Sequence, residues 1–73
     1  MASIEVKSDI TGNVWKVLKG AGEPVEADEP IVILESMKME IPVTSPEPGV
    51  IKEVLVKEKE TVGEGVVIVV IEV

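Results

Sequence analysis

The chain has 73 residues, a formal net charge of −7 and neither cysteine nor histidine. It is therefore long enough for one small domain, and disulfides, thiolate zinc sites and histidine-dependent catalysis are excluded. The acidic balance also argues against nucleic acid and anionic membrane surfaces as partners, because both would need basic side chains.

Valine and isoleucine dominate the apolar residues, and glycine or proline interrupts the chain every few positions. β-branched residues favour strands, so the pattern predicts an all-β fold without a helix. A helical spacing near residues 14–21 is closed off by Gly20, Gly22 and Pro24. In chain order, we expect strands near residues 3–7, 13–19, 31–36, 40–44, 50–56 and 66–72, with short extended segments at 23–26 and 60–63.

The second half of the sequence repeats the first at a shift of 37 positions. The clearest block is Ile-Val-Ile-Leu-Glu at 31–35, which aligns with Ile-Val-Val-Ile-Glu at 68–72. Halves that cannot each bury an apolar face are expected to pack on one another. We therefore predict one domain over residues 1–73, made of two four-stranded antiparallel sheets related by an approximate twofold axis. The expected shared core contains Val14, Leu18, Ile31, Ile33, Ile51, Leu55, Ile68 and Val70.

Two features of the sequence stand out against the repeat. Trp15 aligns with Lys52, so we expect the tryptophan to be partly exposed. Met37 and Lys38 lie at the midpoint of the repeat and have no counterpart, so they should stand alone at the end of the molecule opposite the chain termini. We expect this pair to form a two-residue hairpin turn with positive φ at one or both residues.

Lys38 is the candidate functional residue. Tight turns favour Asn-Gly or Asp-Gly, so placing Met37 and Lys38 there tolerates strain, which tends to mark function. Met37 and Met39 add exposed apolar side chains that suit a partner's contact surface. An exposed lysine has a pKa of about 10.4, so it is poorly suited to act as a base. It is better placed to be modified by another enzyme. We expect its amine to be free of salt bridges, whereas an ordinary surface lysine is the simpler alternative.

The segment Glu-Ser-Met-Lys-Met-Glu-Ile-Pro-Val at 35–43 resembles the biotinylation motif of biotin carboxyl carrier domains. The resemblance covers essentially the whole chain and is closest to free-standing bacterial biotin/lipoyl attachment proteins, including the stretch Gly-Asn-Val-Trp-Lys-Val at 12–17. It implies a flattened barrel-sandwich (the biotinyl/lipoyl-carrier fold) with biotin joined to Lys38 by an amide. Met37 and Met39, and secondarily Glu35 and Glu40, would be read by partner enzymes.

The same resemblance implies a non-catalytic carrier in a carboxylase system. A biotin protein ligase would modify Lys38, and the arm would shuttle carboxybiotin between a biotin carboxylase and a carboxyltransferase. Family members usually have glycine where Asp28 stands and aspartate where Glu23 and Glu60 stand, which puts the turn at Asp28 in question. The isolated domain is expected to be a cytoplasmic monomer without a metal site.

Two alternatives remain open. A lipoyl domain has the same fold, but its tip commonly reads Asp-Lys-Ala, so Met-Lys-Met favours biotin; a dual attachment protein would accept lipoate as well. An unmodified structural module would have no reason to keep this tip. An enzyme in its own right is disfavoured because the chain has no histidine, cysteine or arginine.

Overall fold

The computed structural model describes residues 2–73 and consists of strands and loops, without a helix in that range. Residues 2–73 accordingly contain no helix that is long and apolar enough to cross a membrane. The strands are β1 (Ser3–Lys7), β2 (Gly12–Val17), β3 (Pro24–Val25), β4 (Pro30–Ser36), β5 (Met39–Thr44), β6 (Gly49–Val54), β7 (Thr61–Val62) and β8 (Val67–Glu72).

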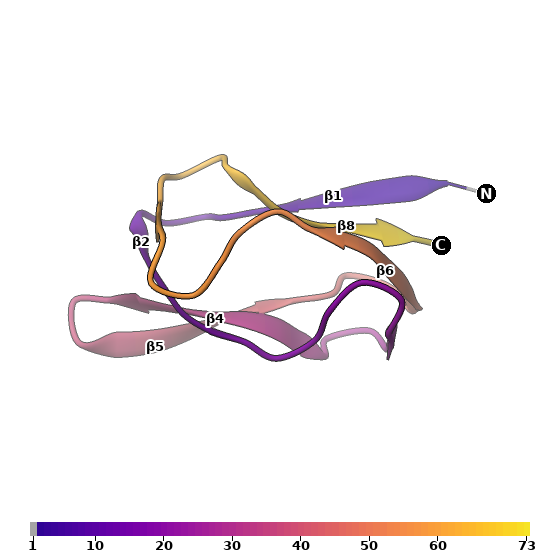
Figure 1. Ribbon diagram of the computed structural model, residues 1–73, viewed down its shortest axis with the longest axis horizontal. Coiled ribbons are helices and arrows are strands. Elements are labelled where there is room, and N and C mark those ends of the chain that lie inside the picture. Colours follow the sequence, from indigo (N-terminus) through magenta and orange to yellow (C-terminus); the bar gives the residue numbers. More distant parts are fainter. Residues whose placement is uncertain (1) are drawn as a thin grey trace.

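The strands form two four-stranded antiparallel sheets that face one another (Figure 1). The strand orders are β1-β8-β6-β3 and β5-β4-β2-β7. A shift of 37 residues, forward for β1 and β3 and backward for β6 and β8, turns the first sheet into the second in the same order. β2 and β6 also have identical burial patterns. The predicted pair of sheets and the internal repeat are both confirmed.

Strand positions follow the predictions, with shorter ends at two places. β2 ends at Val17 and β6 at Val54, two residues before the predicted ends. A capped loop follows each of these strands, and in the first one Glu23 accepts a hydrogen bond from the Gly20 backbone N–H. Glu60 accepts the equivalent bond from Lys57, so glutamate caps both loops at the positions where aspartate is usual.

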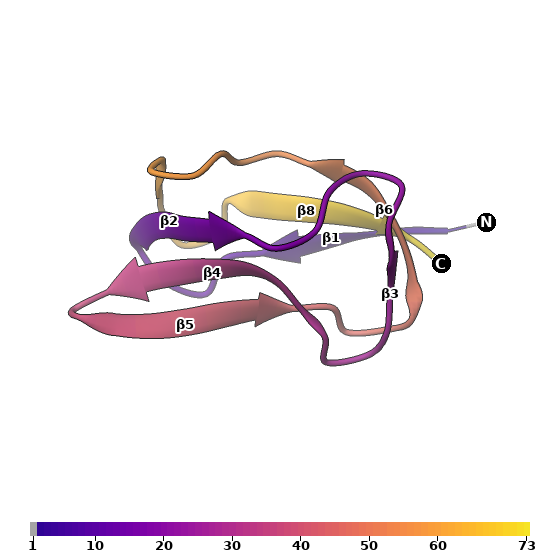
Figure 2. The same ribbon diagram turned by 60° about the horizontal axis from the view of Figure 1, so that its bottom comes forward.

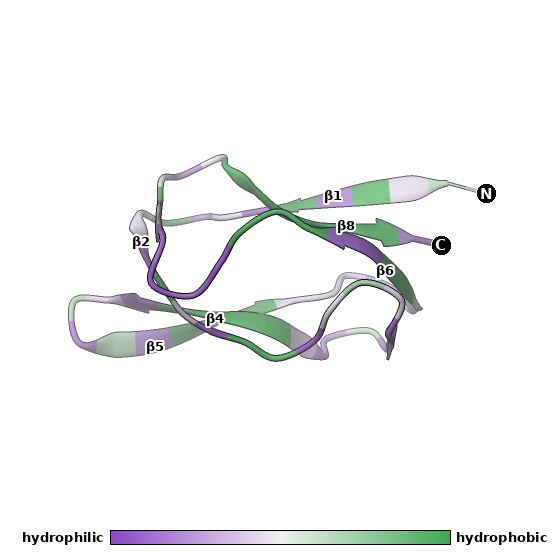
Figure 3. Cartoon of the chain, viewed as in Figure 1, coloured by the Kyte–Doolittle hydropathy of each residue, from purple (hydrophilic) through white to green (hydrophobic). Residues whose placement is uncertain are grey.

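The core lies between the sheets, and half of the predicted core residues belong to it. Val14, Ile31, Ile51 and Ile68 are buried as predicted. Further buried apolar side chains, not predicted, are Val25, Val32, Leu34, Val43, Val56, Val62, Val69 and Ile71. Figure 3 shows hydrophobic residues along the strands, interrupted by hydrophilic ones on strands such as β5 and β6.

The prediction of Leu18 and Leu55 as core residues was wrong, since they are 45% and 46% exposed. The cause is a bulge between Val14 and Lys16 in β2, with an equivalent one in β6. An extra residue in one strand reverses the alternation of side chains beyond it, so both leucines face solvent. Trp15 is the extra residue in β2, and its 48% exposure confirms that prediction.

Ile33 and Val70 were also wrongly assigned to the core, because they are only half-buried. Bulges early in β4 and β8 bury two consecutive residues, such as Ile31 and Val32, on the inner side. Regular alternation then turns Ile33 and Val70 to the outer faces of their sheets.

The turns repeat as faithfully as the strands. Ser8 and Ser45 are buried, and their hydroxyls donate hydrogen bonds to the carbonyls of Ile10 and Glu47. Asp28, at φ 65°, occupies the left-handed conformation that Gly65 adopts in the second half. Aspartate therefore accommodates the turn that glycine usually makes, which resolves the question raised at that position.

Candidate functional site

Met37 and Lys38 form the turn between β4 and β5, and they project at the end of the molecule opposite both termini (Figures 1 and 2). Their φ angles are 52° and 66°, and Ser36 pairs with Met39 directly beneath them. Positive φ at both central residues is the combination of a type I′ turn, which matches the right-handed twist of paired strands. The predicted two-residue turn is confirmed.

Neither residue is suited to that backbone conformation. The left-handed region costs a residue with a Cβ about 1–2 kcal/mol, and glycine or asparagine would avoid much of this. The hairpin holds the strained pair because the register of β4 and β5 is fixed by cross-strand pairs below it. The rigid strands therefore present Lys38 at a defined place.

The Lys38 side chain is exposed and has no acidic partner. Among residues 2–73 the single ion pair joins Lys19 to Glu29, with 3.1 Å between Nζ and Oε2. Both conditions set for a modification site are thereby met: the lysine is not buried, and it is not paired with Glu35 or Glu40. Its amine is accessible to a reagent or an enzyme.

The other predicted residues surround Lys38 on the hairpin. Met37 is 90% exposed and Met39 is 59% exposed, so the lysine stands between two accessible thioethers. Glu35 and Glu40 lie directly opposite one another, two residue pairs below the tip, and both are exposed. Like charges opposite each other disfavour pairing, so these acids contribute no evident stability to the hairpin.

A loop that the sequence did not single out adjoins the hairpin. The Ser36 hydroxyl donates a hydrogen bond of 3.1 Å to the Thr11 carbonyl. This bond joins the end of β4 beside the turn to the β1–β2 loop. Asp9 and Ile10 of that loop line a pocket with residues of β4 and β5. The available signal was the repeat itself, because Asp9 and Ile10 align with Pro46 and Glu47, which differ in character.

The described part of the chain offers no other reactive arrangement. Within residues 2–73 there is no group of three acidic, histidine or cysteine side chains placed to hold a metal ion. Glu29, just before the end of β4 opposite the tip, has a pKa lowered by hydrogen bonding to the Glu26 backbone and by Lys19. Lys38 therefore stays the candidate residue for modification, with its exposed amine in a strained turn.

Known proteins are similar to this chain in sequence and in fold. A family model described as "Biotin-requiring enzyme" matches residues 2–71. The biotin/lipoyl attachment protein of Bacillus subtilis (strain 168) is 47% identical over 60 residues, which cover 82% of each chain.

Two solved structures are similar over 99% of the chain. One is the Kluyveromyces lactis urea carboxylase (TM-score 0.93, 30% identity), of which this chain matches only 6%. The other is the lipoyl domain of the Azotobacter vinelandii 2-oxoglutarate dehydrogenase complex (TM-score 0.76, 28% identity, 96% of that domain). Because the family model matches residues 2–71, the chain belongs to the biotin/lipoyl attachment family. Members of this family are carrier domains that attach biotin or lipoate covalently.

Proposed function

We propose that this protein is a biotin carboxyl carrier and that Lys38 is its attachment residue. The observation that carries the proposal is the hairpin tip, where an exposed, unpaired lysine is held between two methionines in a backbone conformation that neither central residue favours. A residue serving only to reverse the chain would be better replaced by asparagine or glycine. The strain is explained when the side chain itself is required.

The tip fits an amide-linked group. The amine of Lys38 has no ion pair to break, and its carbon stem extends from the end of two paired strands. Biotin, once attached, would supply a ring that carries CO₂ between the sites of a biotin carboxylase and a carboxyltransferase. The chain's own part is to position the arm and to present a surface that these enzymes and a biotin protein ligase recognise.

The sequence at the tip supports biotin over lipoate. Lipoyl domains commonly carry Asp-Lys-Ala, whereas this chain carries Met37-Lys38-Met39. Adaptable thioether side chains suit an apolar contact surface on a ligase, and Glu35 and Glu40 add two charges below it. Relatives of both kinds share the fold, so lipoylation is the competing outcome that an experiment must test.

Intact mass spectrometry after incubation with a biotin protein ligase, ATP and biotin tests the proposal. We expect one biotinyl group per chain, and none on Lys38→Arg, which keeps the positive charge. Lys59→Arg is the matched control, because Lys59 is also exposed and has a φ of 74° in a turn but lacks methionine neighbours. It should be labelled like the unchanged protein.

A parallel incubation with a lipoate ligase, ATP and lipoate separates the alternatives. Label that persists on Lys38→Arg would contradict the assignment of the site. Lipoyl transfer at a rate equal to or above that of biotin would replace the carboxyl carrier with a lipoyl or dual carrier. An unmodified mass with both active ligases would leave a structural module as the function.

A further inference from the structure

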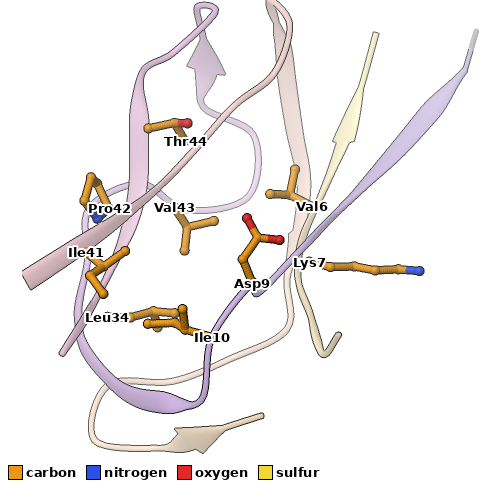
Figure 4. A pocket seen from close by; sticks show the side chains of 9 residues that line it. All are labelled: Val6, Lys7, Asp9, Ile10, Leu34, Ile41, Pro42, Val43 and Thr44. Carbon is orange, nitrogen blue, oxygen red and sulfur yellow. The ribbon is translucent and has the colours of Figure 1, made fainter. Parts of the chain in front are cut away.

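A pocket of about 140 Å³ lies between the edge strands β1 and β5, on the inner side of the hairpin base (Figure 4). Its apolar wall includes Ile10 from the β1–β2 loop and Leu34, Ile41 and Val43 from the hairpin strands. The Asp9 carboxylate is directed towards the space between these side chains, whereas the Lys7 side chain points away from it (Figure 4). The pocket therefore combines an apolar wall with one anionic hydrogen-bond acceptor.

The acceptor and part of the wall are absent from the equivalent place in the repeat. Leu34, Ile41 and Val43 align with Ile71, Ile4 and Val6, all apolar. Asp9 and Ile10, in contrast, align with Pro46 and Glu47. The fold alone does not require the pair Asp9 and Ile10, since the other half builds the same turn without it.

Hydrogen bonds within the β1–β2 loop and to its neighbours hold it in place, and two of them involve serine hydroxyls as donors. The buried Ser8 hydroxyl donates to the Ile10 carbonyl at 2.6 Å, and the Ser36 hydroxyl donates to the Thr11 carbonyl at 3.1 Å. The second bond joins the loop to the hairpin that carries Lys38. The pocket is consequently fixed relative to the tip.

The pocket lies within reach of a group carried on Lys38. Leu34 and Ile41 form the third residue pair below the Met37-Lys38 turn, which places them about 10 Å along the strands from the tip. A biotinyl-lysine arm has about eleven bonds between Cα and the ring system, and at about 1.1 Å of advance per bond it extends to about 12 Å. The arm can fold back along the hairpin and set its head at the pocket.

The chemistry of the pocket matches the head of biotin. The sulfur-containing ring is apolar and suits Ile10 and Ile41, while the fused ureido ring has N–H groups that can donate to the Asp9 carboxylate. A cavity of about 150 Å³ lined by apolar side chains accepts a benzene ring, so the pocket has room for the sulfur-containing ring, and the fused ureido ring would lie beside it at the Asp9 carboxylate. The dithiolane of lipoate has no N–H donor and would leave Asp9 without a partner.

We propose that this pocket is a docking site for the head of the biotin attached to Lys38 of the same molecule. The inference rests on the proposed biotin carrier function. Tethering gives a head group an effective concentration in the millimolar range, so even a pocket with millimolar affinity is about half occupied. Weak docking of this kind shields the ring between encounters and still releases it to a partner enzyme.

Chemical shift mapping by nuclear magnetic resonance tests the proposal. Amide and methyl signals are compared between unmodified and biotinylated protein, and we expect the changes to extend from the tip to Ile10, Ile41 and Leu34. Ile10→Glu installs the residue that the repeat carries there and should reduce the changes at Ile41 and Leu34 at least twofold. Glu47→Ile, at the equivalent loop, is the matched control and should leave them unchanged.

A second variant and a separate probe keep the test independent of folding and of labelling. Asp9→Ala removes the acceptor without touching the apolar wall and should also reduce the changes at least twofold. Titrating unmodified protein with N-methyl biotinamide to millimolar concentration should shift the same signals, and Asp9→Ala should weaken this. The probe needs no ligase, so failure of labelling and failure of docking are distinguishable.

Three results would overturn the docking site. Changes confined to Met37, Lys38 and Met39 in biotinylated protein would show an undocked arm. Changes at the pocket that grow with protein concentration would show that the head binds a second copy. Equal changes for attached lipoate would show that Asp9 makes no selective contact.

Discussion

At one end of the molecule β4 and β5 are joined by Met37 and Lys38, whereas at the other end the equivalent strands β8 and β1 run to the chain termini (Figure 2). The terminal strands stay paired without a turn. The Val73 N–H donates to the Ala2 carbonyl at 2.9 Å, and the Ala2 N–H donates back at 3.3 Å. One arrangement of strands is thus closed covalently at one end and left open at the other.

The pairing of these strands does not depend on the strained turn, because β1 and β8 pair without one. Paired strands hold the open end together, so the hairpin end would also pair with an easier turn. The positive φ values of Met37 and Lys38 are therefore a local cost that folding does not require. Moving the covalent connection from the hairpin end to the terminal end therefore tests whether folding and function need the same turn.

The largest effect is expected from a circular permutant that joins Val73 to Ala2 through Asn-Gly and opens the chain between Met37 and Lys38. The strands remain paired, so the protein should fold and give an unchanged circular dichroism spectrum. Lys38 then lies at a free chain end, and ligase labelling should fall at least tenfold. We expect selectivity for Lys38 to depend on its rigid presentation, because the other six lysines carry the same amine.

A permutant opened between Lys57 and Glu58 is the control, since it keeps the hairpin intact. It should be labelled at the rate of the parent chain. Full labelling of the permutant opened at the tip would show that the ligase needs neither the closed turn nor the covalent link from Met37 to Lys38.

The second expected effect is a loss of stability when a Cβ is added at Gly12 or Gly49, which lie against the two ends. A Cβ built on Gly12 would lie 2.8 Å from the Glu35 carbonyl oxygen at the hairpin base. At Gly49 it would lie 2.5 Å from the Glu72 carbonyl oxygen and 2.8 Å from Ile71 Cγ2. Both alanine variants should lose stability, by about 1–3 kcal/mol, with Gly49→Ala the more affected because it also meets the buried Ile71.

Urea unfolding measures the difference between the two variants. Gly63→Ala is the control, because an added Cβ there has no neighbour within 4 Å and φ is not in the left-handed region. A greater loss for Gly12→Ala than for Gly49→Ala would mean that the open end gives way more easily than the closed one.

Much of this architecture was predictable from the repeat and from the β-branched composition. The alignment of residues 31–35 with 68–72 implied that β4 and β8 occupy equivalent places, and the midpoint of the repeat located the turn. Glu35, Glu40, Met37, Met39 and Lys38 lie where the sequence places them. The role of each in recognition stays a prediction.

The errors have one physical origin. Bulges reverse side-chain alternation, and no residue type marked them, so Leu18, Leu55, Ile33 and Val70 were assigned to the wrong side. The pocket at Asp9 and Ile10 was missed because it depends on how an irregular loop approaches β5. Periodicity carries no information about such contacts.

The third effect concerns the closed end alone. Replacing Met37-Lys38 with Asn-Gly gives the turn its favoured residues and should raise the free energy of unfolding by about 1–2 kcal/mol. Labelling should be abolished in the same variant. Denaturant unfolding with unchanged slope measures the gain, and placing Asn-Gly instead at Lys52-Glu53, within β6, is a control that should destabilise. A variant no more stable than the parent would show that the native turn carries no strain.

The smallest expected effect concerns a difference between the two halves of the repeat, not between the two ends of the molecule. Glu29 accepts a hydrogen bond from the Glu26 backbone N–H and pairs with Lys19, whereas the repeat has Val66 and Val56 at the positions of Glu29 and Lys19. These contacts hold the pKa of the Glu29 carboxyl below its ordinary value of 4.5. A carboxyl with a lowered pKa stabilises the folded state above its unfolded pKa, and this contribution is lost as the pH falls through the folded value.

Glu29→Gln should therefore lower the melting temperature slightly at pH 7, by less than half of the change produced by Asn-Gly at the turn. The difference from the parent should shrink below pH 4.5 and vanish once the carboxyl of the parent is protonated. Raised salt should shrink it as well, because the group is exposed to solvent. Glu64→Gln is the control: the carboxylate of Glu64 makes no ion pair within residues 2–73, so its replacement should leave the melting temperature at pH 7 unchanged. A difference that persists at pH 2 would assign the role of Glu29 to packing of its side chain instead of its charge.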